Sequence, residues 1–406
     1  MGLIGILLST SCYEEYTFSS EHLNNIFSFT MSANAEKKVL ESRGEQFVVE
    51  PLPEMEYGGT RYLLGQMKIR GQSALDFQRK SYSINLDNFI IFEDDNSIYR
   101  EFEKFKLISM VFDYTYIENR LSHLLLNQIG LWPLYSFFTE VKINNDHQGL
   151  YLFIEDPDSY LFQNKSAEIV LRRYYRNEVS SFELNPDVAV NNSEYFINQF
   201  QSLYTSNLSN YTGEQLYTVL SHHMNIENYM RKIAFDFIIE NGDYTDEIYF
   251  YATEKNGVTY FDIIPWDYDD IFSGTRHEVG RDWAVGTTFG VRIYNTKEDV
   301  LNELNGRLIF SIEDDLDYTI AMDDYLYQKY LNELKYVLSR FTTEKVEVTF
   351  DKLYAELFPY YQKPEIIEQS QYDANPTSLE IFNDNLKKKK AALISRIDWI
   401  NNQLKN

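Results

Sequence analysis

The chain has 406 residues, of which 62 are acidic and 37 are basic, and its formal net charge is −25. This charge repels nucleic-acid backbones and anionic membrane surfaces, so we expect no nucleic-acid partner, and a phosphate compound would need a metal ion or a local basic pocket to bind. The length suits one large two-lobed domain or two domains.

A short apolar run at residues 3–8 precedes the sequence Ser-Thr-Ser-Cys, which ends at Cys12. This pattern resembles the end of a bacterial lipoprotein signal, although it lacks a positive n-region and a chance match stays an alternative. We therefore expect residues 1–12 to be a signal remnant and Cys12 to carry a lipid anchor, which would make the protein an extracytoplasmic lipoprotein of the cell envelope. Residues 13–55 are expected to form a tether and N-terminal strands, followed by one domain over residues 56–406.

Strand patterns and one helix pattern come next along the chain. Two strand-like runs over residues 62–86 surround the sequence Arg-Gly-Gln-Ser, and the second run, at 80–86, alternates polar and apolar side chains with the period of a strand. Residues 113–130 place isoleucine and leucine side chains on one face of a predicted helix, which ends at Gly130.

Two hairpins are predicted farther along. Residues 137–154 alternate on both sides of an Asn-Asn-Asp turn. Residues 156–215 are polar and are expected to be loops with short helices, and residues 226–237 predict a buried amphipathic helix. Residues 249–264 contain an Asn-Gly turn between alternating strands, which is the strongest short-range signal for a hairpin.

The C-terminal third is predicted to be mainly helical. A polar stretch at 271–300 is expected to be a loop beside the site, and helices are predicted over 325–341 and 379–404. The four lysines at 387–390 are expected to form a solvated face. The order of elements predicts an α+β fold with a mostly antiparallel sheet and a helical part.

Two acidic segments flank the second hairpin. They are Asn241-Gly242-Asp243 and the sequence Pro-Trp-Asp-Tyr-Asp-Asp at residues 265–270. A hairpin returns the chain to its starting point, so we expect these carboxylates to lie close together. Carboxylates on strand ends and tight loops suit a divalent metal ion and a bound nucleotide phosphate.

Several charged residues occur in the order in which a protein kinase has its functional residues. That order is a lysine on a strand, a glutamate on a helix, a hinge, a catalytic aspartate and, after a short hairpin, a metal-binding aspartate. Lys80, Glu118, residues 154–156, Asp243 and Asp267 occur in this order. Only the kinase order points to Glu118, so we interpret this residue as a charge on the helix surface.

These motifs resemble the spore-coat protein H (CotH) kinases over residues 60–275. The motifs are Arg-Gly-Gln-Ser followed by Lys-Ser-Tyr, the stretch 113–120 before a helix and Gly-Leu, Gly-Leu-Tyr followed by a glutamate, Asn-Gly-Asp, and Ile-Pro-Trp-Asp-Tyr-Asp. The resemblance implies an atypical, two-lobed kinase-like fold that uses ATP with magnesium or manganese. It also implies phosphorylation of a serine or threonine on a protein partner, which the acidic chain would attract if that partner is basic.

The resemblance implies a role for each matching residue. Asp243 is expected to orient or deprotonate the acceptor hydroxyl. Asp267 is expected to hold the metal, with Asp269 as a second ligand. The implied cofactor-binding residues are Lys80 for phosphate charge, Arg70 or Arg120 for positioning, and Glu155, whose role is unassigned.

The chain departs from the family pattern at Glu247. The family usually has an asparagine at this place, just before the aromatic strand. A glutamate is also a hard-oxygen ligand and is expected to hold magnesium, but it adds negative charge beside ATP. A catalytically inactive member of the family is therefore an alternative.

Other interpretations of these residues stay open. Asp243 alone would cap a turn, and residues 267–270 alone would suit a structural calcium loop. A second function is a non-catalytic surface lipoprotein that binds a glycan or a protein through its aromatic side chains, since the chain has 33 tyrosines. A third is a hydrolase with two carboxylates in a cleft. The sequence contains no P-loop motif and no His-Glu-x-x-His zinc motif.

Overall fold

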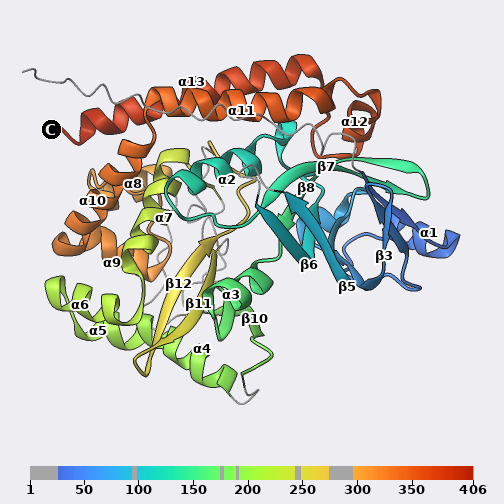
Figure 1. The fold of residues 1–406 in the computed structure, drawn as a ribbon. Helices are drawn as coiled ribbons and strands as arrows, with labels where there is room; N and C mark the ends of the chain where they lie inside the picture. The colour runs from blue at the N-terminus through green and yellow to red at the C-terminus, as the bar shows by residue number, and fades with distance from the viewer. Residues whose placement is uncertain are drawn as a thin grey trace, which may run out of the picture.

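The computed structural model describes residues 26–93, 98–173, 178–188, 192–242, 248–273 and 296–405. It has an α+β architecture with two sheets and a helical lobe, as the sequence predicts (Figure 1). Strand pairs are antiparallel except for β1 (Ile26–Thr30) and β7 (Ser136–Ile143), which run parallel. Cys12 lies outside the described residues. Within the part of the chain that the structure describes, no helix has the length and apolar character needed to cross a bilayer.

The larger sheet has eight strands in the order β3-β2-β1-β7-β8-β6-β5-β4. Its other strands are β2 (Glu54–Tyr57), β3 (Thr60–Tyr62), β4 (Leu64–Arg70), β5 (Ser81–Glu93), β6 (Tyr99–Ile108) and β8 (Asp146–Glu155). The strands predicted over 62–86 and the hairpin predicted over 137–154 are therefore confirmed. Strand β6 was not predicted, and it lies between β5 and β8.

The smaller sheet has four strands in the order β10-β9-β11-β12. Strands β11 (Ile248–Lys255) and β12 (Val258–Pro265) form the predicted second hairpin, whose turn residues Asn256 and Gly257 both have positive φ. Strands β9 (Ile169–Arg173) and β10 (Val179–Leu184) lie in the stretch predicted to be loops with short helices, so that prediction is wrong for these residues.

The other regular elements of the described chain are helices. They are α1 (Ala33–Glu41), α2 (Glu118–Gln128), α3 (Pro157–Lys165), α4 (Ser193–Ser202), α5 (Leu208–Asn210), α6 (Gly213–His223), α7 (Ile226–Ile239), α8 (Lys297–Leu304), α9 (Asp315–Met322), α10 (Asp324–Arg340), α11 (Thr343–Tyr361), α12 (Pro364–Gln369) and α13 (Leu379–Gln403). Short turns of other helix types are η2 (Ser73–Asp76), η3 (Tyr114–Tyr116), η5 (Leu203–Asn207) and η6 (Ser370–Tyr372). The three helices predicted around α7, α10 and α13 are confirmed.

Two apolar cores lie on opposite faces of the larger sheet. On β8, Tyr151 and Phe153 belong to one core, while Leu150 and Leu152 belong to the other. Successive side chains of a strand point to opposite faces, so β8 is buried on both sides. The second core continues into the smaller sheet and the helices, and it joins the two sheets into one body.

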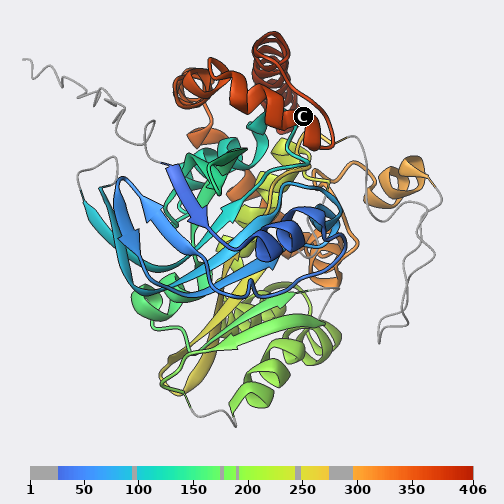
Figure 2. The same cartoon turned by 90° about the vertical axis from the view of Figure 1, so that its right-hand side faces the viewer.

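The C-terminal helices pack across α2. In Figures 1 and 2, α11 and α13 lie on one side of α2, and the smaller sheet lies on the other side. A buried arginine, Arg79, connects Asp373, which lies between η6 and α13, to strand β8 of the larger sheet. Its guanidinium donates to Asp373 at 2.5 Å and 2.6 Å and to the Gln148 carbonyl at 2.8 Å. It also packs against Gly149, where an added Cβ would lie 3.3 Å from the guanidinium carbon.

Candidate active site between the two sheets

The two acidic segments lie side by side. The backbone N–H of Gly242 donates to the carbonyl of Asp270 at 2.8 Å, and that of Ser273 donates to the carbonyl of Glu240 at 3.0 Å. A Cβ added at Gly242 would lie only 2.1 Å from Oδ2 of Asp270. The absence of a side chain at Gly242 therefore lets the two segments approach this closely. Two of the predicted site residues, Asp243 and Glu247, lie outside the described residues.

Asp267 follows strand β12 and has a left-handed backbone, with φ at 46°. Trp266 and Tyr268 are buried, whereas Asp267 and Asp269 are partly exposed. The backbone N–H of Tyr268 donates to Oδ1 of Asn119 at 2.9 Å, which ties this loop to helix α2. The buried side chains thus anchor the segment and leave its two flanking carboxylates within reach of solvent and ligands.

A buried carboxylate, Asp236 on helix α7, holds both acidic segments. Its Oδ1 accepts hydrogen bonds from Nδ2 of Asn241 and from the hydroxyl of Tyr268, each at 3.2 Å. Its backbone carbonyl accepts the N–H of Asn241 at 3.1 Å. Lys232, one turn earlier, forms an ion pair with Asp236 at 2.8 Å and compensates its charge in the core.

Two cations lie beside Trp266. The guanidinium carbon of Arg70 and Nζ of Lys106 are each 5.8 Å from the centroid of the Trp266 ring, within the range of cation–π attraction. Lys106 is on β6, and Nζ also donates to Asp156. Burial favours the neutral amine, but Asp156, together with Tyr249 and Asp158, outweighs burial and raises the pKa of Lys106. Positive charge is therefore retained close to the second acidic segment.

Two carboxyl groups near this lysine have pKa values that are shifted in opposite directions. Burial acts to raise the pKa of Asp156, but Lys106 overrides it and lowers that pKa. Burial and the adjacent Asp156 charge raise the pKa of Asp158 to about 7. Asp156 and Asp158 lie at the point where the chain leaves β8 and enters α3 on its way to the smaller sheet.

The predicted cofactor lysine, Lys80, has other partners. Its Nζ donates to the carbonyls of Ser42 at 2.7 Å and Leu75 at 2.5 Å, and the residue is 1% exposed. Burial and the nearby Arg43 charge lower the pKa of Lys80 to about 8. In this structure its ammonium group caps the turn before β5, and a role in phosphate binding remains a prediction.

Two more residues of the predicted cofactor set form internal contacts. Arg120 forms two 2.8 Å hydrogen bonds with the carboxylate of Glu356, which join α2 to α11. Glu155 accepts the N–H of Tyr135 at 2.9 Å, and burial raises the pKa of Glu155 to about 7. The structure gives each a packing role, and their cofactor roles stay predictions.

The interpretation of Glu118 as a surface charge is wrong. The residue is 7% exposed, and its carboxylate accepts a hydrogen bond from Lys389 on α13 at 2.5 Å. Lys389 is one of the four lysines expected to form a solvated face. Its side chain is 12% exposed, whereas that of the neighbouring Lys388 is 73% exposed, so the expectation is wrong for Lys389 and right for Lys388.

Sequence reasoning missed Lys106 and Asp236 as members of this site. Lys106 lies in strand β6, where several charged residues obscure the alternation of polar and apolar side chains that would indicate a strand. Asp236 lies inside an apolar helix, and a buried acid in such a helix is itself a signal, because an ionised side chain is rarely buried without a partner. Asn119 lay within the motif at 113–120 but had no assigned role.

The donor set suits a hard divalent cation. Asp267 and Asp269 offer carboxylate oxygens of the kind that magnesium and manganese prefer. Among the residues that the structure describes, no cluster of three or more His, Cys, Asp or Glu side chains is arranged to hold a metal. Asp243 and Glu247, which would complete the predicted set, lie outside that part.

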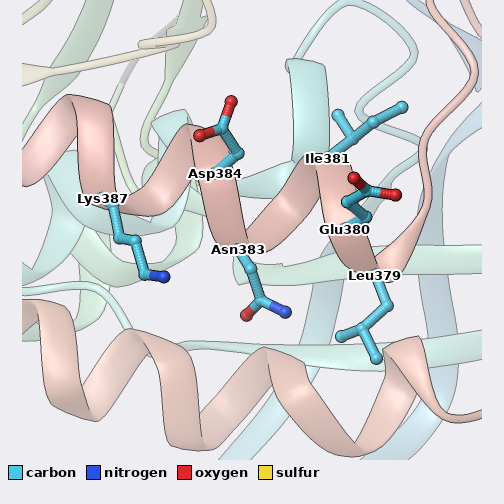
Figure 3. Close-up of a pocket in the computed structure, with 6 residues that line it drawn as sticks. All are labelled: Leu379, Glu380, Ile381, Asn383, Asp384 and Lys387. Carbon is cyan, nitrogen blue, oxygen red and sulfur yellow. The ribbon is translucent and has the colours of Figure 1, made fainter.

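An open hollow elsewhere does not match this chemistry. It follows the first turns of α13 and is lined by Leu379, Glu380, Ile381, Asn383, Asp384 and Lys387. In Figure 3, Asp384 and Asn383 point to opposite sides of the helix. The lining includes one cation and no residue of either acidic segment, so we do not assign the nucleotide site to it.

Comparison with known proteins places this chain in a family. The family model described as "CotH kinase protein" matches residues 67–398. The chain is also 23% identical over 241 residues to "Inner spore coat protein H" of Bacillus subtilis (strain 168), an alignment that covers 56% of this chain and 64% of that protein. The match thus spans less than two thirds of the relative. Because the family model covers most of the chain, including both acidic segments, the protein belongs to the CotH kinase protein family.

Proposed function

We propose that this protein is a metal-dependent kinase that transfers the γ-phosphoryl group of ATP to a serine or threonine hydroxyl of a protein. The observation that carries the proposal is the junction of the two acidic segments at Gly242 and Asp270. This junction brings the segment that contains Asp243 next to the one that contains Asp267. Phosphoryl transfer requires carboxylates for metal ions and an aspartate at the acceptor hydroxyl.

Each residue has a distinct role in this proposal. Asp267 and Asp269 hold magnesium or manganese, and Glu247 adds a ligand where the family usually has asparagine. A metal ion held by these carboxylates would supply positive charge to the phosphates. Asp243 accepts a hydrogen bond from the acceptor hydroxyl, orients it toward the phosphorus and takes its proton.

We propose that Lys106, with Arg70, supplies the phosphate-facing positive charge. Both cations lie beside Trp266, which immediately precedes the proposed metal ligand. Lys106 is on a central strand of the larger sheet and has the nearby carboxylate of Asp156, so its charge is balanced before ligand binds. Lys80, in contrast, donates to two backbone carbonyls, those of Ser42 and of Leu75 in the η2 turn.

A kinase-like two-lobed arrangement is part of the proposal. The chain passes from the larger sheet to the smaller one at Glu155 and Asp156, where a kinase has its hinge. The order that follows, with the first acidic segment, the hairpin β11–β12 and the second acidic segment, is the kinase order. We propose that the nucleotide lies between the sheets at this crossing.

The name of the Bacillus subtilis relative assigns that protein to the spore coat, and we propose a surface or coat association for this chain as well. Lipidation at Cys12 stays part of that proposal. The net charge of −25 favours a basic protein substrate, because opposite charge speeds encounter. If the protein is inactive, the same surface association would support the second function, a binding protein for a glycan or a coat component.

The test is phosphate incorporation from labelled ATP into a basic, serine-rich peptide, with magnesium or manganese. We expect incorporation by the wild type and a loss of about 100-fold or more in Asp267→Asn and Asp243→Asn, a scale typical of removing one electrostatic contact to a transition state. Asp384→Asn, which removes an exposed carboxylate on α13, serves as the control and should retain activity. Undiminished incorporation by Asp267→Asn would refute the metal role, and metal-independent glycan binding without nucleotide binding would favour the second function.

A further inference from the structure

Helix α13 contacts the segment 113–119 through two residues on one of its faces. Nδ2 of Asn385 donates to Oγ1 of Thr115 at 2.7 Å, and Nζ of Lys389 donates to Oε1 of Glu118 at 2.5 Å. Residues four apart share a helix face, so both bonds come from the side of α13 that packs on the protein. The C-terminal helix is therefore fastened by polar contacts to the segment before α2.

This segment has an unusual backbone. Thr115 and Tyr116 have φ values of 68° and 61°, a left-handed conformation that β-branched and bulky side chains rarely adopt. The hydroxyl of Tyr361 donates to the carbonyl of Thr115 at 2.9 Å. Asp113 accepts the N–H groups of Glu118 at 2.8 Å and Asn119 at 2.9 Å. Such a conformation persists because the surrounding contacts hold it.

The same segment contacts the backbone of the second acidic segment and of the residues after it. Oδ1 of Asn119 accepts the N–H of Tyr268. Burial raises the pKa of Glu118, and the N–H of Ile271, which lies near its carboxyl group, acts to lower that pKa. These two contacts lie on either side of Asp269. Nζ of Lys389 is also 5.1 Å from the ring centroid of Phe272. A continuous set of contacts thus runs from α13 to the backbone of the proposed metal-holding loop.

We propose that Lys389 of α13 is a positioning residue, which through Glu118 fixes residues 267–272 in the geometry that holds the metal and its nucleotide. The inference rests on the proposed function, because it concerns the same site. Lys389 acts through its hydrogen bond to Glu118, which fixes that side chain, and through its contact with the ring of Phe272. Without the lysine, the buried Glu118 loses this partner, and the loop loses its connection to α13.

The test compares full-length wild type with Lys389→Met, Lys389→Arg and Lys388→Met. Lys388 is the matched control, since it is adjacent on the same helix but points to solvent and pairs with Asp384. Hydrogen exchange is measured for the amides of residues 268–272 and, for reference, in the hairpin β11–β12. We expect these loop amides to exchange at least about tenfold faster in Lys389→Met, with the hairpin unchanged. Lys388→Met should match the wild type, and Lys389→Arg should restore most of the protection.

A second measurement is the dissociation constant of manganese–ATP, which we expect to rise about tenfold in Lys389→Met and to stay within twofold in Lys388→Met. Equal loop protection in Lys389→Met and Lys388→Met would overturn the proposal. Faster exchange of loop and hairpin alike would also overturn it, because that pattern indicates a general loss of stability. A wild type that binds no manganese–ATP would refute the proposed function, while the exchange result would still decide whether Lys389 positions the loop.

Discussion

Replacing Gly242 by alanine tests the junction of the acidic segments directly. The backbone of Gly242 does not have positive φ, so alanine is allowed by its conformation, and the effect comes from contact alone. The new Cβ would lie 2.1 Å from Oδ2 of Asp270 and 2.8 Å from both Cβ and Oγ of Ser273. An unstrained contact needs about 3.5 Å, so Cβ of Ser273, which no side-chain rotation can move, must shift by about 0.7 Å.

Rotation of the Asp270 side chain relieves its own contact, but Cβ of Ser273 is fixed to the backbone, and the N–H of Ser273 is bonded to the carbonyl of Glu240. Overpacking of this kind costs about 1–3 kcal/mol of folding stability. A displacement that approaches about 1 Å in a catalytic site is expected to lower the rate of phosphoryl transfer about 100-fold.

The assay is the initial rate of phosphate incorporation, with the unfolding midpoint measured in parallel. Gly65→Ala is the matched control, since its Cβ would lie 2.8 Å from Oδ1 of Asp87, an exposed side chain that can move. We expect Gly65→Ala to retain its rate and Gly242→Ala to lose about 100-fold while remaining folded at the assay temperature. A folded Gly242→Ala variant with the wild-type rate would refute the reasoning that this junction sets the active geometry.

Lys106→Met should weaken manganese–ATP binding more than Lys80→Met does, as measured by calorimetry, and the reverse order would return the phosphate role to Lys80. Glu155→Gln should flatten the pH dependence of the free energy of unfolding. Burial raises the pKa of Glu155 to about 7, so the folded state binds a proton that the unfolded state releases. The protonated Glu155 therefore contributes its full stabilisation below about pH 4.5, and this contribution is lost as the pH rises through 7. The expected change is up to about 3 kcal/mol between those limits, measured by denaturant unfolding, and an unchanged slope in the variant would contradict it. Asp236→Ala should cost about 3–5 kcal/mol in the same unfolding assay, because it leaves the buried ammonium of Lys232 unpaired, and a cost under about 1 kcal/mol would show that Asp236 does not hold the two segments.

The parts of the fold that the sequence predicts well are those with local signals. The hairpin at 248–265 follows from an Asn-Gly turn between alternating strands, and helices α7, α10 and α13 follow from apolar periodicity. Strand β6 has charged side chains at Arg100, Glu101, Glu103 and Lys104, so its apolar alternation is hidden until its neighbours are known. The short strand β9 is stabilised by pairing with β11, and β10 pairs with β9; no local pattern indicates these contacts.

The candidate site divides in the same way. The adjacency of the two acidic segments could be predicted, because a hairpin brings its flanking residues together. The partners of Lys80 and Arg120 could not be predicted in this way. Lys80 donates to the carbonyls of Ser42 and Leu75, and Arg120 pairs with Glu356, which is 236 residues away in the chain. The burial of Glu118 depends likewise on α13. Tertiary contacts, rather than the identity of the charged residue, decide which cations face the site.

The most direct measurement is the position of manganese in a crystal of the protein with a non-hydrolysable ATP analogue, located by anomalous scattering. The account predicts a manganese ion within about 2.2 Å of a carboxylate oxygen of Asp267, with Asp243 beside it and the analogue's phosphates facing Lys106 and Arg70. A manganese–nucleotide complex bound elsewhere on the protein, with Asp267 not coordinated, would contradict the central claim that the two acidic segments form a single phosphoryl-transfer site.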